Sequence, residues 1–74
     1  MNNQKTYNNS SEAEINKLKL EYNKKMINKR VWVSLTKGGY FATVIGVPGS
    51  EHFQVKTDKG EERVVDIYDV RSAE

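Results

Sequence analysis

The side chains that could perform acid–base or nucleophilic chemistry are few in this chain and lie far apart. His52 is the single histidine, and strand alternation places it on a polar side, facing solvent. The serine and threonine hydroxyls have no base near them in the sequence, so none is expected to be an activated nucleophile. Four carboxylates could form an acidic patch, but their spacing does not match a metal-binding loop: Glu61, Glu62, Asp66 and Asp69. We therefore predict no catalytic residue, no cofactor and no metal site.

Aromatic side chains near turns are stronger candidates for a functional role. Tyr40 and Phe41 are adjacent, so strand alternation requires that at least one of them face away from the core. Tyr68 lies between Asp66 and Asp69 in a segment that we expect to form a 3₁₀ turn, with its hydroxyl within reach of solvent. Exposed aromatic residues contribute a large share of the binding energy at interfaces. The alternative for Tyr68 is structural, with its ring closing one end of the fold.

Cationic side chains are concentrated in the N-terminal part of the chain. Residues 1–30 carry seven Lys and Arg against three Glu, a net charge of +4, whereas residues 31–74 carry five against seven acidic residues, or −2. Nucleic-acid-binding surfaces concentrate positive charge where they contact phosphate, so such contacts would come mainly from the N-terminal part. The candidate phosphate contacts are Lys17, Lys19, Lys24, Lys25, Lys29 and Arg30. The alternative is a solvated helix on which the lysines pair with Glu14 and Glu21.

Length and composition limit the class of protein. A chain of 74 residues forms one small domain, and the absence of cysteine excludes disulfide bonds and thiolate metal sites. No apolar run approaches the ~20 residues that a membrane-spanning helix needs, and the first residues lack the apolar segment of a secretory signal. We therefore expect a soluble cytoplasmic protein without a membrane partner.

The first thirty residues predict a tail followed by one amphipathic helix. Residues 1–10 are rich in Asn and Gln, have little to bury, and are expected to be a flexible tail. Ser11 and Glu14 have the spacing of a capping box, and we place the helix at residues 11–29, with its regular part at about 12–28.

Two apolar stripes run along this expected helix. The first consists of Ile15, Leu18, Tyr22 and Met26, and we expect it to cover an open end or flank of the following domain. The second is narrower and consists of Leu20 and Ile27. It either completes the same packing or contacts a second copy of the chain in a homo-oligomer.

From Arg30 onward the period of the apolar residues changes from that of a helix to that of strands. Five strands are expected, at residues 30–36, 40–47, 52–57, 62–66 and 70–71. Glycine-containing turns follow the first three strands, Gly46 marks a bulge or bend, and residues 67–69 form the 3₁₀ turn. Short strands joined in this order predict a mainly β protein, with a small five-stranded SH3-like barrel at residues 30–74 after one N-terminal helix.

SH3-like barrels often bind partners through an aromatic surface beside the first and third turns. In this chain that surface would consist of Trp32, Tyr40, Phe41, Phe53 and Tyr68. Trp32, Tyr40 and Phe53 each have a simpler alternative role in packing the barrel or the helix.

The second strand resembles that of Tudor-type barrels, which tends to read Tyr-x-Ala-x-Val. Tyr40, Ala42 and Val44 match that pattern, and Asp58-Lys59-Gly60 stands where the family tends to have Asp-Tyr-Gly. The match continues at Val65 and Val70-Arg71 and covers about 35 residues. The resemblance implies recognition of methylated lysine or arginine by aromatic faces, with Tyr40, Trp32 and Phe53 as walls. Lys59 replaces a frequent cage tyrosine, and its charge would repel a cationic ligand.

Val65-Asp66-Ile67-Tyr68 is similar to the Val-Gln-Ile-Tyr segment of plasmid-encoded type II dihydrofolate reductases, which are SH3-like chains of similar length. The resemblance covers about 45 residues, including Arg30-Val31, Tyr40, Ile45-Gly46 and Glu51-His52-Phe53-Gln54-Val55. It implies a tetramer whose central pore is lined by that segment and binds NADPH and dihydrofolate. This chain differs at two pore positions, because Asp66 replaces the glutamine and Val33 stands where the family has a lysine.

These differences decide between two functions. An ionised carboxylate only accepts hydrogen bonds, and four copies of Asp66 around a pore would repel an anionic cofactor. We therefore predict a non-catalytic binding module, a small adaptor or regulator whose partner is a protein segment or a nucleic acid. The alternative is an oligomeric reductase of the type II kind, acting on dihydrofolate with NADPH.

Overall fold

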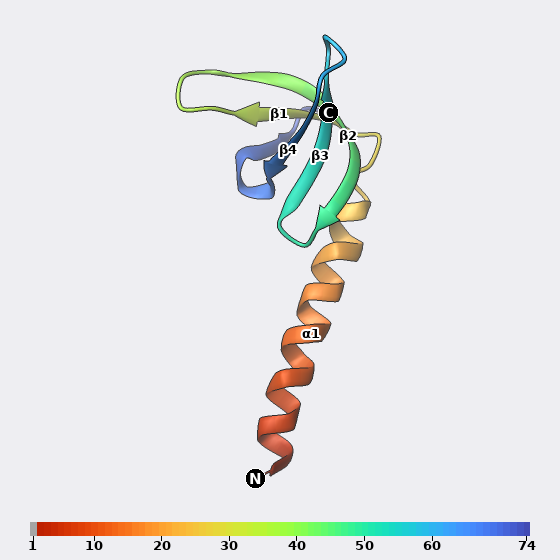
Figure 1. Cartoon of the computed structure of the whole chain (residues 1–74), viewed down its shortest axis with the longest axis vertical. Coiled ribbons are helices and arrows are strands. Elements are labelled where there is room, and N and C mark those ends of the chain that lie inside the picture. The colour runs from red at the N-terminus through yellow and green to blue at the C-terminus, as the bar shows by residue number, and fades with distance from the viewer. Residues whose placement is uncertain (1) are drawn as a thin grey trace.

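The structure is a computed structural model that describes the backbone of residues 2–74 and the side chains of residues 13–74. The elements are α1 (Asn2–Lys24), β1 (Arg30–Ser34), β2 (Gly39–Gly49), β3 (His52–Thr57), β4 (Glu62–Asp66), the 3₁₀ helix η1 (Ile67–Asp69) and β5 (Val70–Ser72). The strands form one sheet, and α1 projects from it (Figure 1). The mainly β fold with one helix is therefore confirmed.

All strand pairs in the sheet are antiparallel, in the order β4-β3-β2-β1-β5. The chain forms three successive hairpins and then passes through η1, so that β5 returns to pair with β1, with Val70 opposite Val33. β4 and β5 are the two edges, and no pairing joins them within residues 2–74. The sheet is therefore not closed into a barrel.

The core lies on one side of the sheet, where alternate residues of three strands point inward. Its buried members are Val31, Val33, Ala42, Val44, Phe53 and Val55. β2 is long and strongly curved (Figure 1), and its register with β3 shifts on both sides of Gly46. This irregularity confirms the expected bulge or bend at Gly46, and it allows one strand to wrap around the core.

Two glycines make the first hairpin possible. Gly38 adopts a φ of +81°, which residues with a Cβ rarely adopt. At Gly39 a Cβ would lie 2.3 Å from the carbonyl oxygen of Val33 and 2.7 Å from the Trp32 ring. Any larger residue at position 39 would therefore clash with β1 and with the Trp32 ring. Only glycine lets the two strands pair this closely.

The helix differs from the sequence-based expectation at both ends. It begins at Asn2 instead of near residue 11, and residues 2–24 contain no proline or glycine that would interrupt it. It ends at Lys24, and residues 25–28 form turns in which Asn28 has a φ of +73° and donates its N–H to the Val44 carbonyl. The flexibility that we expected of residues 1–10 stays a prediction.

Only the C-terminal end of the helical segment packs against the sheet. Met26 and Ile27 contact the core, and Asn23 bonds to the β2–β3 turn. Ile15, Leu18 and Tyr22 remain exposed, because α1 leads away from the sheet (Figure 1). The expectation that the first stripe covers the sheet is therefore wrong except at Met26. Ile27, which we had considered for a contact between subunits, is partly buried against the core instead.

Candidate functional site

Trp32 and Phe41 form an aromatic pair on the outer face of the sheet. They lie directly opposite each other on β1 and β2, and their side chains are on the face of the sheet opposite to that of the buried Val31 and Val33. Their rings meet edge to face, with centroids 4.8 Å apart and an interplanar angle of 71°. Phe41 is 48% exposed, so the pair offers apolar area to a partner.

The Arg30 guanidinium lies over the Phe41 ring, 5.5 Å from its centroid. Both of its terminal nitrogens donate to the Asp58 carboxylate, at 2.6 and 2.7 Å. These bonds raise the pKa of Arg30 and lower the pKa of Asp58. The bidentate geometry fixes the arginine over the ring.

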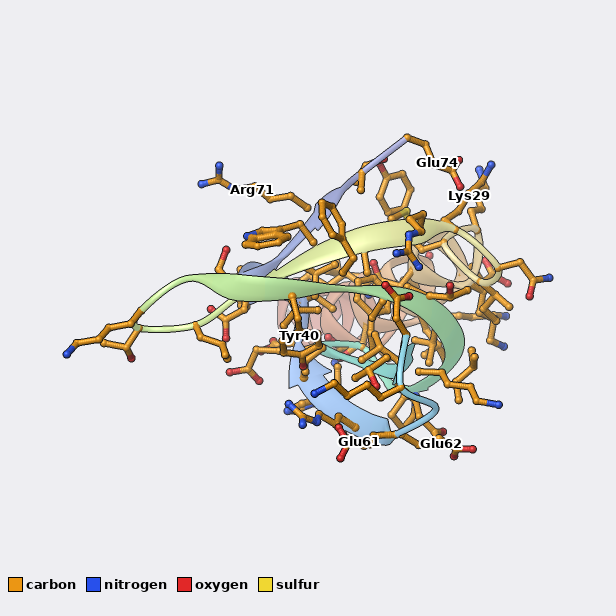
Figure 2. The ribbon with its side chains drawn as sticks, turned by 90° about the horizontal axis from the view of Figure 1, so that it is seen from above. Lys29, Tyr40, Glu61, Glu62, Arg71 and Glu74 are labelled. Carbon is orange, nitrogen blue, oxygen red and sulfur yellow. The ribbon has the colours of Figure 1, made fainter. Side chains whose placement is uncertain are left out.

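A second arginine–aromatic stack lies on the other side of β2. The Arg63 guanidinium is 5.0 Å from the centroid of the half-buried Tyr40 ring, and it donates to Glu61 at 2.9 Å. Its pKa is raised, first by the side-chain interaction with Tyr40 and then by the charge of Glu61. Tyr40 and Glu61 lie on one side of the β2 ribbon and Arg71, from β5, on the other (Figure 2).

A shallow cavity of about 270 Å³ is lined by residues of both stacks. It is lined by Tyr40, Phe41, Thr57, Asp58, Lys59, Glu61 and Arg63. Its walls therefore combine two aromatic rings with charges of both signs. We call Arg30, Trp32, Tyr40, Phe41 and Arg63 the aromatic–arginine surface.

A separate apolar groove of about 480 Å³ lies between α1 and η1. Its lining residues are Ile15, Leu18, Lys19, Tyr22, Asn23, Ile67 and Tyr68, and we call it the helix groove. It shares no lining residue with the cavity at Tyr40. Tyr68 is 74% exposed, so its ring does not close an end of the fold.

The five aromatic residues that we expected in one partner-binding surface are thus divided among three places. Trp32, Tyr40 and Phe41 belong to the aromatic–arginine surface, and Tyr68 belongs to the helix groove. Phe53 is 4% exposed and packs in the core, where a partner cannot contact its ring.

The expected phosphate contacts also fall into two groups. Arg30 pairs with Asp58, and Lys29 lies 3.6 Å from the Glu74 carboxylate, which also accepts from the Arg30 N–H (Figure 2). The pKa of Glu74 is lowered, first by that backbone bond and then by the charge of Lys29. The other group is exposed on or just after α1 and forms no ion pair with the carboxylates of residues 13–74: Lys17, Lys19, Lys24 and Lys25.

The residues of Val65-Asp66-Ile67-Tyr68 do not share one site. Asp66 faces the outer side at the end of β4, 3.0 Å from His52 Nε2, so the expected solvated histidine is exposed but has a carboxylate neighbour. Ile67 packs against the core, with its N–H bonded to the Glu51 carbonyl, and it lines the helix groove together with Tyr68. Within the described part of the chain no three His, Cys, Asp or Glu side chains are placed to hold a metal ion.

Asn23 is a structural residue that the sequence analysis missed. It is 7% exposed, and its Nδ2 donates to the Ser50 carbonyl at 2.9 Å, which ties α1 to the β2–β3 turn. No local pattern marks it, because its partner is a backbone carbonyl 27 positions away.

No protein-family model matches this chain, and neither a curated protein nor a solved structure is significantly similar to it. No helix in the described residues combines the length and apolarity needed to cross a membrane. The aromatic–arginine surface and the helix groove are therefore the basis for a functional assignment.

Proposed function

We propose that this protein is a non-catalytic binding module that recognises a segment of another protein through the aromatic–arginine surface. The observation that carries this proposal is the Trp32–Phe41 pair, with Phe41 48% exposed, beside a cavity with walls of mixed charge. Aromatic residues and arginine are enriched among the residues that dominate binding energy, and here both are held in place before a partner arrives.

In this proposal the fold is that of an SH3-like barrel with a Tudor-like second strand. The barrel is open because the edge strands β4 and β5 do not pair with each other. Three features support it: the order β4-β3-β2-β1-β5, the 3₁₀ helix before β5, and the bend of β2 at Gly46. A fold of this kind hosts many functions, so the partner is argued from the surface alone.

The charges around the cavity favour a protein segment over a methylated cation. The faces of Phe41 and Tyr40 are already covered by Arg30 and Arg63, so a cationic ligand would have to displace an arginine from each ring. Lys59, at the cavity wall, adds further repulsion. A peptide can instead contact the exposed part of the Phe41 ring without displacing an arginine, and the charged wall can hydrogen-bond to its backbone.

A nucleic acid is the second candidate partner, and one observation favours it. The cationic group at Lys17, Lys19, Lys24 and Lys25 forms no ion pair with the described carboxylates, so it could contact phosphate. By contrast, Arg30 and Arg63 on the sheet are each neutralised by a carboxylate. Phosphate contacts would make affinity for a single-stranded oligonucleotide fall steeply with added salt.

Reductase activity of the type II kind is not part of this proposal. Asp66 pairs with His52 on the outer face, and Tyr68 points toward α1 instead of sharing a site with Asp66. We expect no oxidation of NADPH above background when dihydrofolate is added at micromolar protein concentration. Turnover would contradict the proposal and would make Asp66→Gln the informative variant.

The proposal is tested with peptides selected from a displayed random library against the purified protein. Trp32 is the only tryptophan, so its fluorescence reports binding at the proposed surface directly. We expect Phe41→Ala to weaken binding by ~2 kcal/mol, about thirtyfold, because the ring is a central apolar contact.

Val64→Ala is the matched control, because Val64 is 60% exposed on β4, outside the cavity. This variant should bind like the original protein. Unchanged affinity in Phe41→Ala, or selected peptides that perturb only α1 in an NMR titration, would overturn the assignment of this surface.

A further inference from the structure

The helix groove leaves four large apolar side chains exposed next to one another. Ile15, Leu18 and Tyr22 on α1 are 51%, 63% and 70% exposed, and Tyr68 on η1 is 74% exposed. The four line one groove of about 480 Å³, so they form a continuous surface. Contiguous apolar patches of this kind mark interaction sites in soluble proteins.

The spacing of the helix residues indicates that the missing partner is another helix. Ile15, Leu18 and Tyr22 follow one another at intervals of three and four residues, the a, d and a positions of a heptad. Residues at these positions form the seam between paired helices. α1 is the only α-helix in the described residues, so a helix of this chain that covers the seam must come from a second copy.

Charges beside the seam are self-complementary for one orientation of two such helices. Glu14 occupies the g position before Ile15, and Lys19 occupies the e position after Leu18. In a parallel pair, a g residue faces the e residue five positions later on the partner, which places Glu14 of each copy beside Lys19 of the other. In an antiparallel pair, the g positions of the two helices lie next to each other. Glu14 would then lie near Glu21 of the partner, also a g residue, and the two like charges would repel each other.

We propose that two copies of this chain associate through the helix groove, with their α1 helices parallel about a two-fold axis. Such an isologous contact closes on itself and covers the same residues in both copies. Ile67 and Tyr68 form the wall of the groove, where the partner helix contacts them near the C-terminal end of α1. The assembly carries two aromatic–arginine surfaces at the same end.

The area available indicates a dimer that dissociates on dilution. Two tyrosines and two aliphatic residues, each more than half exposed, would remove roughly 500 Å² per copy and about 1,000 Å² in total. This total lies at the lower limit for specific interfaces, so the population of dimer should depend on concentration.

Sedimentation velocity on the full chain from about 1 to about 500 µM tests the proposal. We expect conversion from monomer to dimer over this range, and at least a tenfold weaker dimer for Leu18→Glu, since the change places a charge in the seam. Leu35→Glu is the matched control, because Leu35 is 54% exposed but lies outside the groove. It should leave association unchanged.

Charge reversal tests the orientation. Glu14→Lys and Lys19→Glu should each weaken the dimer, and the double variant should recover it, because opposite charges again face each other. A double variant as weak as either single one would overturn the parallel arrangement. If the original protein remained a monomer at every concentration, the dimer itself would be overturned and the groove would be left to a different protein. Unchanged circular dichroism in Leu18→Glu would show that this variant still folds.

Discussion

Arg30 and Arg63 each lie over an aromatic ring, and each is held there by a carboxylate from the turn between β3 and β4. This turn supplies both Asp58 and Glu61. One short segment therefore orients both arginines of the aromatic–arginine surface, although it contributes neither of the rings that they cover.

Removing the Asp58 charge should change the pH dependence of stability. The pKa of Asp58 is lowered in the folded state by Arg30, so its contribution to the free energy of unfolding is present above the ordinary aspartate pKa. That contribution is lost as the pH falls through the lower folded-state pKa. We expect Asp58→Asn to be less stable than the original protein at neutral pH and equally stable in strong acid.

Thermal melts between neutral pH and strong acid measure this difference. Asp69→Asn serves as the control, because Asp69 forms no ion pair with the described residues. Its melting temperature should follow that of the original protein. If Asp58→Asn remained less stable even in strong acid, the loss would come from packing and not from the carboxylate charge.

At the scale of elements, the helical segment has two parts with different energetic roles. Met26 and Ile27, in the turn after α1, pack against the core, and Asn23 is bonded to the β2–β3 turn. The part of α1 that bears Ile15 and Leu18 projects beyond the sheet (Figure 1). Most of the coupling between helix and sheet should therefore come from residues 23–27.

Ile27→Ala should lower the free energy of unfolding by about 1–2 kcal/mol, because it removes apolar contacts of a partly buried side chain. Urea unfolding followed by circular dichroism gives this value. Ile45→Ala is the matched comparison, since Ile45 is the same residue type but 37% exposed. It should lose less. Equal losses in the two variants would show that the turn after α1 is not coupled to the core more tightly than an outer residue of β2.

At the scale of the whole molecule, the open sheet leaves β4 and β5 as edges. Hydrogen exchange at low protein concentration should show the strongest protection in the ladder between β2 and β3, which is flanked by strands on both sides. The amides of β4 and β5 that point away from the sheet should exchange much faster. Slow exchange of these outward amides would instead indicate that the two edges pair and that the barrel closes in solution.

Much of the fold could be predicted because it depends on local patterns. Alternation and turn residues determined the strands at 52–57 and 62–66, the 3₁₀ helix at 67–69 and the bend at Gly46, all as the structure has them. Each is encoded within a few neighbouring residues, since side chains alternate along a strand and glycine permits the sharp turns. The sequence also identified Trp32 and Phe41 as candidates for an exposed surface.

Only the tertiary structure decided which apolar and charged residues are available. The helix period places Ile15, Leu18 and Tyr22 on one face, but the direction of α1 away from the sheet leaves that face open. Asp58 reaches Arg30 across 28 positions, and Asn23 reaches Ser50 across 27. Contacts over such separations depend on how the strands are ordered and how β2 bends, and no local pattern specifies them.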